Sequence, residues 1–153
     1  MAFNENLTQA LSYIDVINFN AANNTNLNSI GVDMSKFKRI LYVVQNGGIG
    51  AAGTIDGRLQ CSANSNFNTI TNISGTNLTQ ITANNVAETV EVRADQVTNA
   101  NANARYVRLQ LTTGGNALTG VWATGIGSQS EQAPASQYNL NTTYLAVGVV
   151  CNI

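Results

Sequence analysis

Histidine is absent from this chain of 153 residues, and charged side chains are also scarce. Asp, Glu, Lys and Arg together make up 10% of the sequence and leave a net charge of -1. Histidine is the most frequent general acid or base and a common metal ligand, so a reactive site would have to be assembled from scattered carboxylates, hydroxyls and amides. The composition therefore predicts a binding or structural protein, not an enzyme, with no catalytic residue, cofactor or metal.

Basic residues are too few and too scattered for a nucleic-acid partner. The only cluster is Lys36, Lys38 and Arg39, among seven Lys and Arg in all, whereas binding a phosphate backbone takes several such contacts. No apolar run approaches the roughly 18 to 20 residues that span a bilayer, and residues 1–10 lack the basic-then-apolar order of a secretory signal. We therefore expect neither nucleic acid nor a membrane as partner, and synthesis in a cytoplasm.

Cysteine and proline are also rare. Cys61 and Cys151 are the only cysteines; they can pair only if the fold brings their Cα atoms within about 7 Å, and two buried free thiols are the simpler expectation. The single proline, Pro134, lies in a stretch typical of a linker before the last strand. A chain of 16.2 kDa fits one domain with a sizeable core, so a disulfide scaffold is not required.

Three segments alternate apolar and polar residues, as strands buried on one face do. In Thr54–Ser62, every second residue from Ile55 to Cys61 belongs to one face, and the residues between them are polar. The segments Thr89–Ala94 and Arg105–Thr112 have the same period of two. This periodicity predicts three half-buried strands.

Other apolar runs are continuous, at Ile40–Val44, Leu118–Ile126 and Tyr144–Cys151. Strands of this kind need cover on both faces. A central position in a sandwich provides it, but for the last two runs a subunit interface is an equally good cover. Both explanations stay open at this point.

Asparagine is abundant, at 23 positions, and many of these lie in clusters between the apolar segments. Asn tolerates left-handed backbone and forms local hydrogen bonds, so the clusters predict turns between short strands. Helix is expected only as single turns at Ser35–Lys38 and near Arg93–Val97. We predict an all-β fold, an antiparallel β-sandwich in one domain, with residues 1–20 as an N-terminal arm or first strand and residues 21–153 as the sandwich.

Candidate sites are weak. A small hydrolase would need two close carboxylates or an activated hydroxyl, and Glu91, with Arg93 two residues on, is expected on a solvated strand face. Calcium is the most credible metal for Asn-rich loops, but Asp-x-Asn-x-Asp spacings are missing. Trp122 lies inside an apolar run, so core or interface packing is favoured over a sugar-binding platform. That platform would consist of Trp122 with Tyr106, Tyr138 and Tyr144.

Six segments follow one another in a fixed order along the chain: Val32–Val44, Arg58–Ser62, Phe67–Ile70, Ile73–Gly75, Glu91–Val97 and Arg105–Thr112. In this order they resemble small structural proteins encoded among the head genes of tailed bacteriophages. They are similar in particular to capsid decoration, or cement, proteins with a jelly-roll-like sandwich. The resemblance covers residues 32–126, and two departures from it are Ala63-Asn64 in place of an acidic residue and an insert at Asn99–Ala104.

The resemblance implies a protein located in the virion, on the outer surface of an icosahedral shell. Its partner would be the major capsid protein, and it would be a homo-oligomer, with a trimer favoured, that braces neighbouring capsid subunits. An alternative role is a carbohydrate-binding or host-adhesion module of a phage head or tail fibre, because jelly-roll sandwiches also host lectin sites.

Two sets of apolar residues are the candidates for these contacts. We expect Phe3, Leu7 and Leu11 on an N-terminal arm to dock on the capsid. The second set, from the continuous apolar runs, is expected to close contacts between subunits. It consists of Val121, Trp122, Val147 and Val149.

Overall fold

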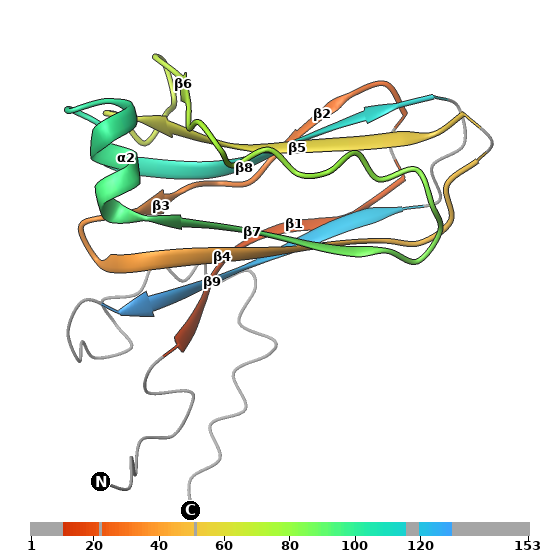
Figure 1. Ribbon diagram of the computed structural model, residues 1–153, viewed down its shortest axis with the longest axis horizontal. Helices are drawn as coiled ribbons and strands as arrows, with labels where there is room; N and C mark the ends of the chain where they lie inside the picture. The colour runs from red at the N-terminus through yellow and green to blue at the C-terminus, as the bar shows by residue number, and fades with distance from the viewer. Residues whose placement is uncertain (1–10, 22, 51, 116–119, 130–153) are drawn as a thin grey trace, which may run out of the picture.

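Two antiparallel sheets pack face to face in the computed structural model, which describes residues 11–21, 23–50, 52–115 and 120–129 (Figure 1). Sheet A has the strand order β1 (Leu11–Asn20), β9 (Val121–Gln129), β4 (Phe37–Asn46), β7 (Ala87–Arg93). Sheet B has the order β2 (Asn26–Asn28), β8 (Tyr106–Gly114), β5 (Thr54–Ser62), β6 (Thr71–Asn72), and β3 (Val32–Asp33) also pairs with β8. One short helix, α2 (Ala94–Ala100), links β7 to β8.

The strand pairing is that of a jelly roll. Strands far apart in the sequence pair in a nested way: β1 with β9, β2 with β8, β4 with β7 and β5 with β6. The two halves then join side by side through β9 with β4 and β8 with β5. This arrangement is the double-sheet jelly roll, and it confirms the predicted all-β, antiparallel sandwich.

The core lies between the sheets and follows the alternation seen in the sequence. The three alternating segments became β5, β7 and β8, and β5 has the predicted bounds, Thr54–Ser62. Their apolar faces point inward, into the space between the two sheets. Completely buried residues of these strands include Ile40, Tyr42, Val44, Ile55, Leu59, Cys61, Val92, Val107, Leu109 and Leu111.

One predicted helix is present and the other is wrong. The turn expected near Arg93–Val97 is α2, with Val97 buried against the end of the sandwich. At Ser35–Lys38 there is a tight turn in which the amide of Lys36 donates to the carbonyl of Asp33 at 3.2 Å. Phe37 already belongs to β4, because its ring fills the core and draws the chain into the sheet.

The N-terminal region is a strand from Leu11 onward, since β1 pairs with β9 from Leu11–Ser128 to Asn20–Val121. Of the two options for residues 1–20, the first strand is therefore correct for Leu11–Asn20. Residues 1–10 lie outside the described part of the chain, as do the expected linker at Pro134, the strand Tyr144–Cys151 and Cys151 itself.

Most inward-facing residues of strand β9 are small, and side chains of the neighbouring strands occupy the space beside them. Ala123, Gly125 and Gly127 point to the core, where large side chains of β1 and β4 lie against them. A Cβ atom on Gly127 would lie 2.6 Å from the Phe37 ring and 2.8 Å from Ile14. The glycines therefore provide the room that the core side chains occupy.

Substituting Gly127 by valine should destabilise the fold by about 1 to 3 kcal/mol, because the added carbons meet Phe37 and Ile14 in a filled core. The measurement is urea unfolding followed by Trp122 fluorescence. Thr124→Val, on the outward face of the same strand, is the matched control and should change the free energy of unfolding by less than about 0.5 kcal/mol. Equal stability of the two variants would show that β9 does not pack as closely as described.

Candidate functional site

Part of the outward face of sheet A, over β1, β9 and the middle of β4, is apolar although solvent borders it. Strand β9 places Trp122, Thr124 and Ile126 on this side, opposite to its small inward residues. In register, Leu41 lies beside Ile126 and Val43 beside Thr124. We call this surface the apolar face. It consists of Leu11, Tyr13, Val16, Leu41, Val43, Trp122, Thr124 and Ile126.

The residues of the apolar face keep part of their surface exposed. Tyr13 is 61% exposed and Leu11 36%, and the other members are partly buried. An antiparallel sheet with one solvated face is normally polar on that side. A contiguous apolar area of this kind is typical of a protein-binding surface.

The outward face of sheet B shows the opposite chemistry. Its central strands carry a chain of side-chain hydrogen bonds between neutral amides and one guanidinium. The Nε2 atom of Gln60 donates to Asn72 at 3.0 Å and to Gln110 at 3.2 Å, and Arg108 donates twice to Gln60 Oε1, at 3.1 and 3.0 Å. The Arg108 guanidinium lies 4.5 Å from the centre of the Phe67 ring. We call this network the amide ladder; it leaves sheet B polar and internally satisfied.

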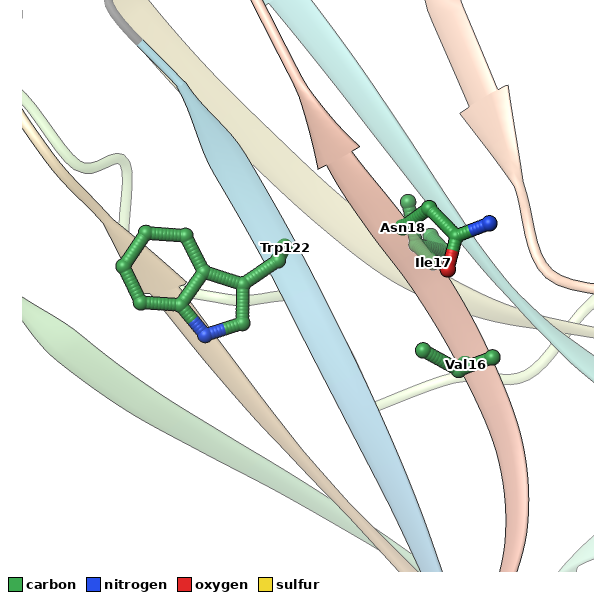
Figure 2. Close-up of a pocket in the computed structure, with 4 residues that line it drawn as sticks. All are labelled: Val16, Ile17, Asn18 and Trp122. Atoms are coloured by element: carbon green, nitrogen blue, oxygen red, sulfur yellow. The ribbon is translucent and has the colours of Figure 1, made fainter. Parts of the chain in front are cut away.

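A shallow hollow of about 400 Å³ opens between β1 and β9, lined by Val16, Ile17, Asn18 and Trp122 (Figure 2). The indole nitrogen of Trp122 donates to Oε1 of Gln45 on β4 at 3.0 Å, which fixes the ring across the sheet. Trp122 is thus a partly exposed aromatic side chain whose orientation is fixed by its hydrogen bond to the Gln45 side-chain amide. The sugar-binding platform that the sequence disfavoured does not include Tyr106, because Tyr106 lies on β8 in the other sheet; Tyr138 and Tyr144 lie outside the described residues.

Asp15 joins β1 to β4 and to the segment before β3. Its carboxylate accepts a hydrogen bond from the Tyr42 hydroxyl at 2.7 Å and from the amides of Ile30 and Gly31, both at 3.2 Å. Burial of the phenol, together with the adjacent Asp15 carboxylate, raises the pKa of Tyr42 well above its ordinary value. Tyr42 therefore stays protonated and serves as a donor, and the cluster tethers strands instead of transferring protons.

Asp33 and Arg105 form a second tether, between β3 and the start of β8. Arg105 donates to the two carboxylate oxygens at 2.9 and 2.6 Å, and Ser35 donates through its amide at 3.0 Å and its hydroxyl at 2.7 Å. Burial by itself raises the pKa of Asp33, but the hydrogen bonds from Arg105 and Ser35 outweigh it and bring the pKa to about 2. A carboxylate held ionised in this way does not suit a general acid.

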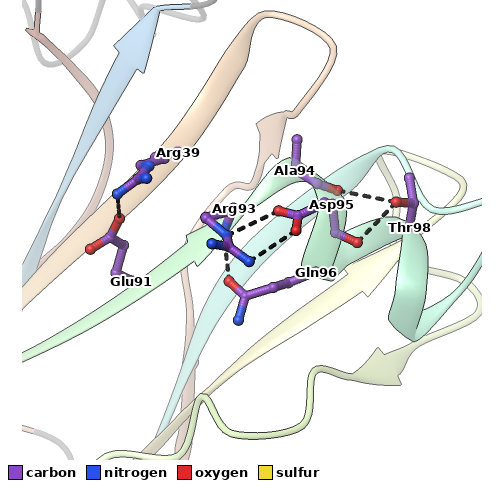
Figure 3. A network of polar contacts seen from close by, with 7 residues as sticks. All are labelled: Arg39, Glu91, Arg93, Ala94, Asp95, Gln96 and Thr98. Carbon is purple, nitrogen blue, oxygen red and sulfur yellow. Dashed lines mark hydrogen bonds and ion pairs between the residues drawn. The ribbon is translucent and has the colours of Figure 1, made fainter.

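The remaining charged pairs are exposed and local. Arg39 reaches Glu91 at 3.2 Å between β4 and β7, so Glu91 lies on a solvated strand face as predicted, with its side chain 47% exposed (Figure 3). Arg93 binds Asp95 in the first turn of α2, at 3.1 and 2.9 Å. Over the described ranges, no group of three or more His, Cys, Asp or Glu residues is placed to hold a metal ion.

Among the predicted contact residues, Trp122 lies on the apolar face and Leu11 at its end, within β1. Val121 needs correction. It is 0% exposed and belongs to the core, because neighbouring residues of a strand point to opposite faces and Trp122 takes the outward one. The predicted Phe3, Leu7, Val147 and Val149 lie outside the described residues.

Six members of the apolar face were missed: Tyr13, Val16, Leu41, Val43, Thr124 and Ile126. A signal was present for four of them, because Leu41 and Val43 lie in the continuous apolar run Ile40–Val44, and Thr124 and Ile126 lie in the largely apolar run Leu118–Ile126. A continuous run indicates that both faces are covered. Tyr13 gave no comparable signal, since the segment around it mixes polar and apolar residues, with Ser12 before it and Asp15 two positions after it.

Comparisons with known proteins gave no match to a protein-family model, to a curated protein or to a solved structure. Within the described residues, no helix has the length and apolar character needed to cross a membrane.

Replacing Asp33 by asparagine should remove about 1 to 2 kcal/mol of stability at neutral pH, a value reduced for the exposure of Arg105. The folded pKa of about 2 lies below the ordinary 3.8. The contribution of Asp33 is therefore complete above about pH 5 and declines as the pH falls toward 2. Urea unfolding between these pH values should give a flatter stability profile for Asp33→Asn than for the unmodified protein.

Asp56→Asn is the control, because Asp56 accepts only an exposed hydrogen bond from Gln80. It should change stability by less than about 0.5 kcal/mol. If the profile of Asp33→Asn is as steep as that of the unmodified protein, the acid sensitivity comes from another carboxylate.

Proposed function

We propose that this protein is a structural component of a phage virion, a decoration protein that binds the outer surface of the capsid and stabilises it. The observation that supports this most is the apolar face on a sandwich whose core is already filled. Such a face is suited to burial against protein, whereas the described carboxylates Asp15, Asp33 and Glu91 are engaged in tethers and surface pairs. We further propose that the protein is not an enzyme.

The sequence supports the same role. The segments that resemble decoration proteins run from residue 32 to 126, which is the stretch from β3 to β9. The low charge fits a partner met through apolar side chains and neutral amides. Each copy needs only a modest contact with the capsid. Several contacts within one oligomer increase its total affinity through multivalency, and many copies bind one shell.

A second candidate function is carbohydrate binding, since lectins also use the jelly roll. The observation that favours it is the hollow beside Trp122, where an aromatic ring and the amide of Asn18 line one surface (Figure 2). The fold alone does not choose between the two roles. A glycan array separates them: the capsid role expects no ligand, and selective binding that disappears in Trp122→Ala would favour the lectin role.

The direct test is to image particles of the phage that encodes the chain, with and without the gene. Decoration predicts many copies arrayed over the shell, and lower resistance of the deficient particles to heat. Adding the purified protein back should restore both. Particles that never carry the protein, or that carry a few copies at one vertex, would rule out the decoration role.

The N-terminal residues provide a sharper test of capsid docking. Because Leu11 belongs to β1, the variant to make is Phe3→Asp with Leu7→Asp, which leaves every described strand intact. It should bind deficient particles at least roughly 10-fold more weakly, since two apolar anchors are lost. The control is Ile70→Asp, an exposed apolar residue on the loop before β6. Equal binding of the two variants would exclude the arm as the docking element.

A further inference from the structure

We propose that Asn46 is a latent modification site. Its side-chain amide is lost as ammonia when the loops at one end of the sandwich open, and the product prevents these loops from closing again. Asn46 is the last residue of β4, and Gly47 follows it. This is the only Asn-Gly pair among the 153 residues of the chain. The co-reactant is water, so the reaction requires neither an enzyme nor a cofactor.

The chemistry depends on the residue that follows the asparagine. The backbone nitrogen of Gly47 can attack Cγ of Asn46, because glycine has no Cβ that hinders the approach. As the new bond from nitrogen to Cγ closes a cyclic imide, the bond from Cγ to Nδ2 breaks, and the proton of the Gly47 amide leaves with the ammonia. Water then adds to either carbonyl of the imide and breaks its bond to nitrogen. The product is an aspartate or an isoaspartate.

The folded structure blocks both groups that have to react. The Gly47 amide donates to the carbonyl of Gly120 at 3.0 Å, so its proton is bound by the protein and shielded from solvent base. Asn46 is only 3% exposed. Its Nδ2 atom donates to the carbonyls of Gly47 at 3.0 Å and Ala83 at 2.9 Å, and its Oδ1 atom accepts from the amide of Val86 at 2.8 Å. While these bonds last, Cγ cannot turn toward the Gly47 nitrogen.

The segment that closes over Asn46 can open without unfolding the sandwich. Residues 82–85 are all exposed, and the amide of Asn85 donates to the carbonyl of Gly47 at 3.0 Å. Asn85 has a positive φ of 56°, a conformation that costs energy in a residue other than glycine. An exposed segment held by backbone hydrogen bonds opens more readily than the core does. Such a local opening releases Asn46 while the two sheets stay packed.

Neither product restores the closed arrangement. In an aspartate, an oxygen takes the place of Nδ2 and faces the carbonyl oxygens of Gly47 and Ala83, so a buried negative charge meets two acceptors. An isoaspartate adds one atom to the main chain at the end of β4. This extra atom shifts the position at which the chain pairs with Val121 of β9 and with Val86. Each product therefore makes a brief opening permanent.

Asn64 provides a matched comparison within the same chain. It is exposed, lies directly after β5 in the loop that follows Ser62, and precedes Ser65. A serine after the asparagine permits the same cyclisation, but more slowly than glycine does, because its Cβ hinders the attacking nitrogen. By sequence alone, Asn46 should therefore react faster than Asn64. By structure, the order is reversed, because only Asn46 is buried.

The first test follows both asparagines in the folded and the urea-unfolded full-length protein at mildly alkaline pH, by mass spectrometry of peptides after digestion with pepsin in acid. In urea, Asn46 should react faster than Asn64. In the folded protein the order should reverse, and the rate at Asn46 should fall at least about 100-fold relative to urea, because the reaction waits for an opening. The rate at Asn64 should change by less than about 10-fold. Equal rates at Asn46 in the two states, or no reaction there in urea, would overturn the inference.

The second test asks whether the modified chain closes again. Protein that has reacted partly in urea is returned to native buffer and treated briefly with a protease that cleaves opened chains. The surviving protein should be depleted about 10-fold or more in chains modified at Asn46, because cleavage follows the population of the open form. Chains modified at Asn64 should survive as well as unmodified ones. Equal survival of the two modified forms would show that the closed end accommodates the product, and would overturn the inference that the modification holds the loops open.

Discussion

The close approach of β9 to the side chains of β1 and β4 sets the geometry of the whole sandwich. Gly127 leaves room for Phe37 and Ile14, and Gly125 leaves room for Tyr42, whose ring would lie 2.9 Å from an added Cβ. The position of the Tyr42 ring in turn decides where its hydroxyl binds the Asp15 carboxylate. Asp15 then fixes where β1 contacts the segment before β3, because it also accepts a hydrogen bond from Gly31. Since packed interiors have little spare volume, a larger residue at either glycine would displace β9, the strand that joins β1 to β4.

The same constraint explains the outward chemistry of sheet A. After Val121, strand β9 presents only Ala123, Gly125 and Gly127 to the core, so its other large apolar side chains lie on the outward side, where burial under a cover would add to stability. Trp122 and Ile126 are those side chains, and Leu41 and Val43 extend the area across β4. Sheet B has no such need, because its outward residues bind one another. One jelly roll thus carries a surface suited to contact and a surface suited to solvent, on opposite sheets.

Much of this fold could be predicted from the sequence, because alternation reports directly on a strand with one buried face. Thr54–Ser62 was predicted with its observed bounds for that reason. The candidate site was harder. Val121 and Trp122 were both assigned to an interface, although adjacent residues of a strand point to opposite faces of the sheet. In a continuous apolar run, the sequence does not show which alternate set of residues faces the core. That choice depends on the bulk of Tyr42 and Phe37 on the neighbouring strand β4. The false helical turn at Ser35–Lys38 has a similar cause, since the Phe37 ring is buried in the core and places this residue in β4.

The amide ladder has a consequence for the conditions under which the protein can work. Its bonds between Gln60, Asn72 and Gln110 join groups that do not ionise. Dissolved ions screen attractions between charges over about 8 Å at physiological ionic strength, but they have little effect on contacts between uncharged dipoles. The amide-to-amide bonds of sheet B should therefore change little from dilute water to brine, and neither acid nor alkali changes the protonation of these amides, whereas the two bonds from the Arg108 guanidinium to Gln60 involve a charge and are the part of the ladder that salt can weaken.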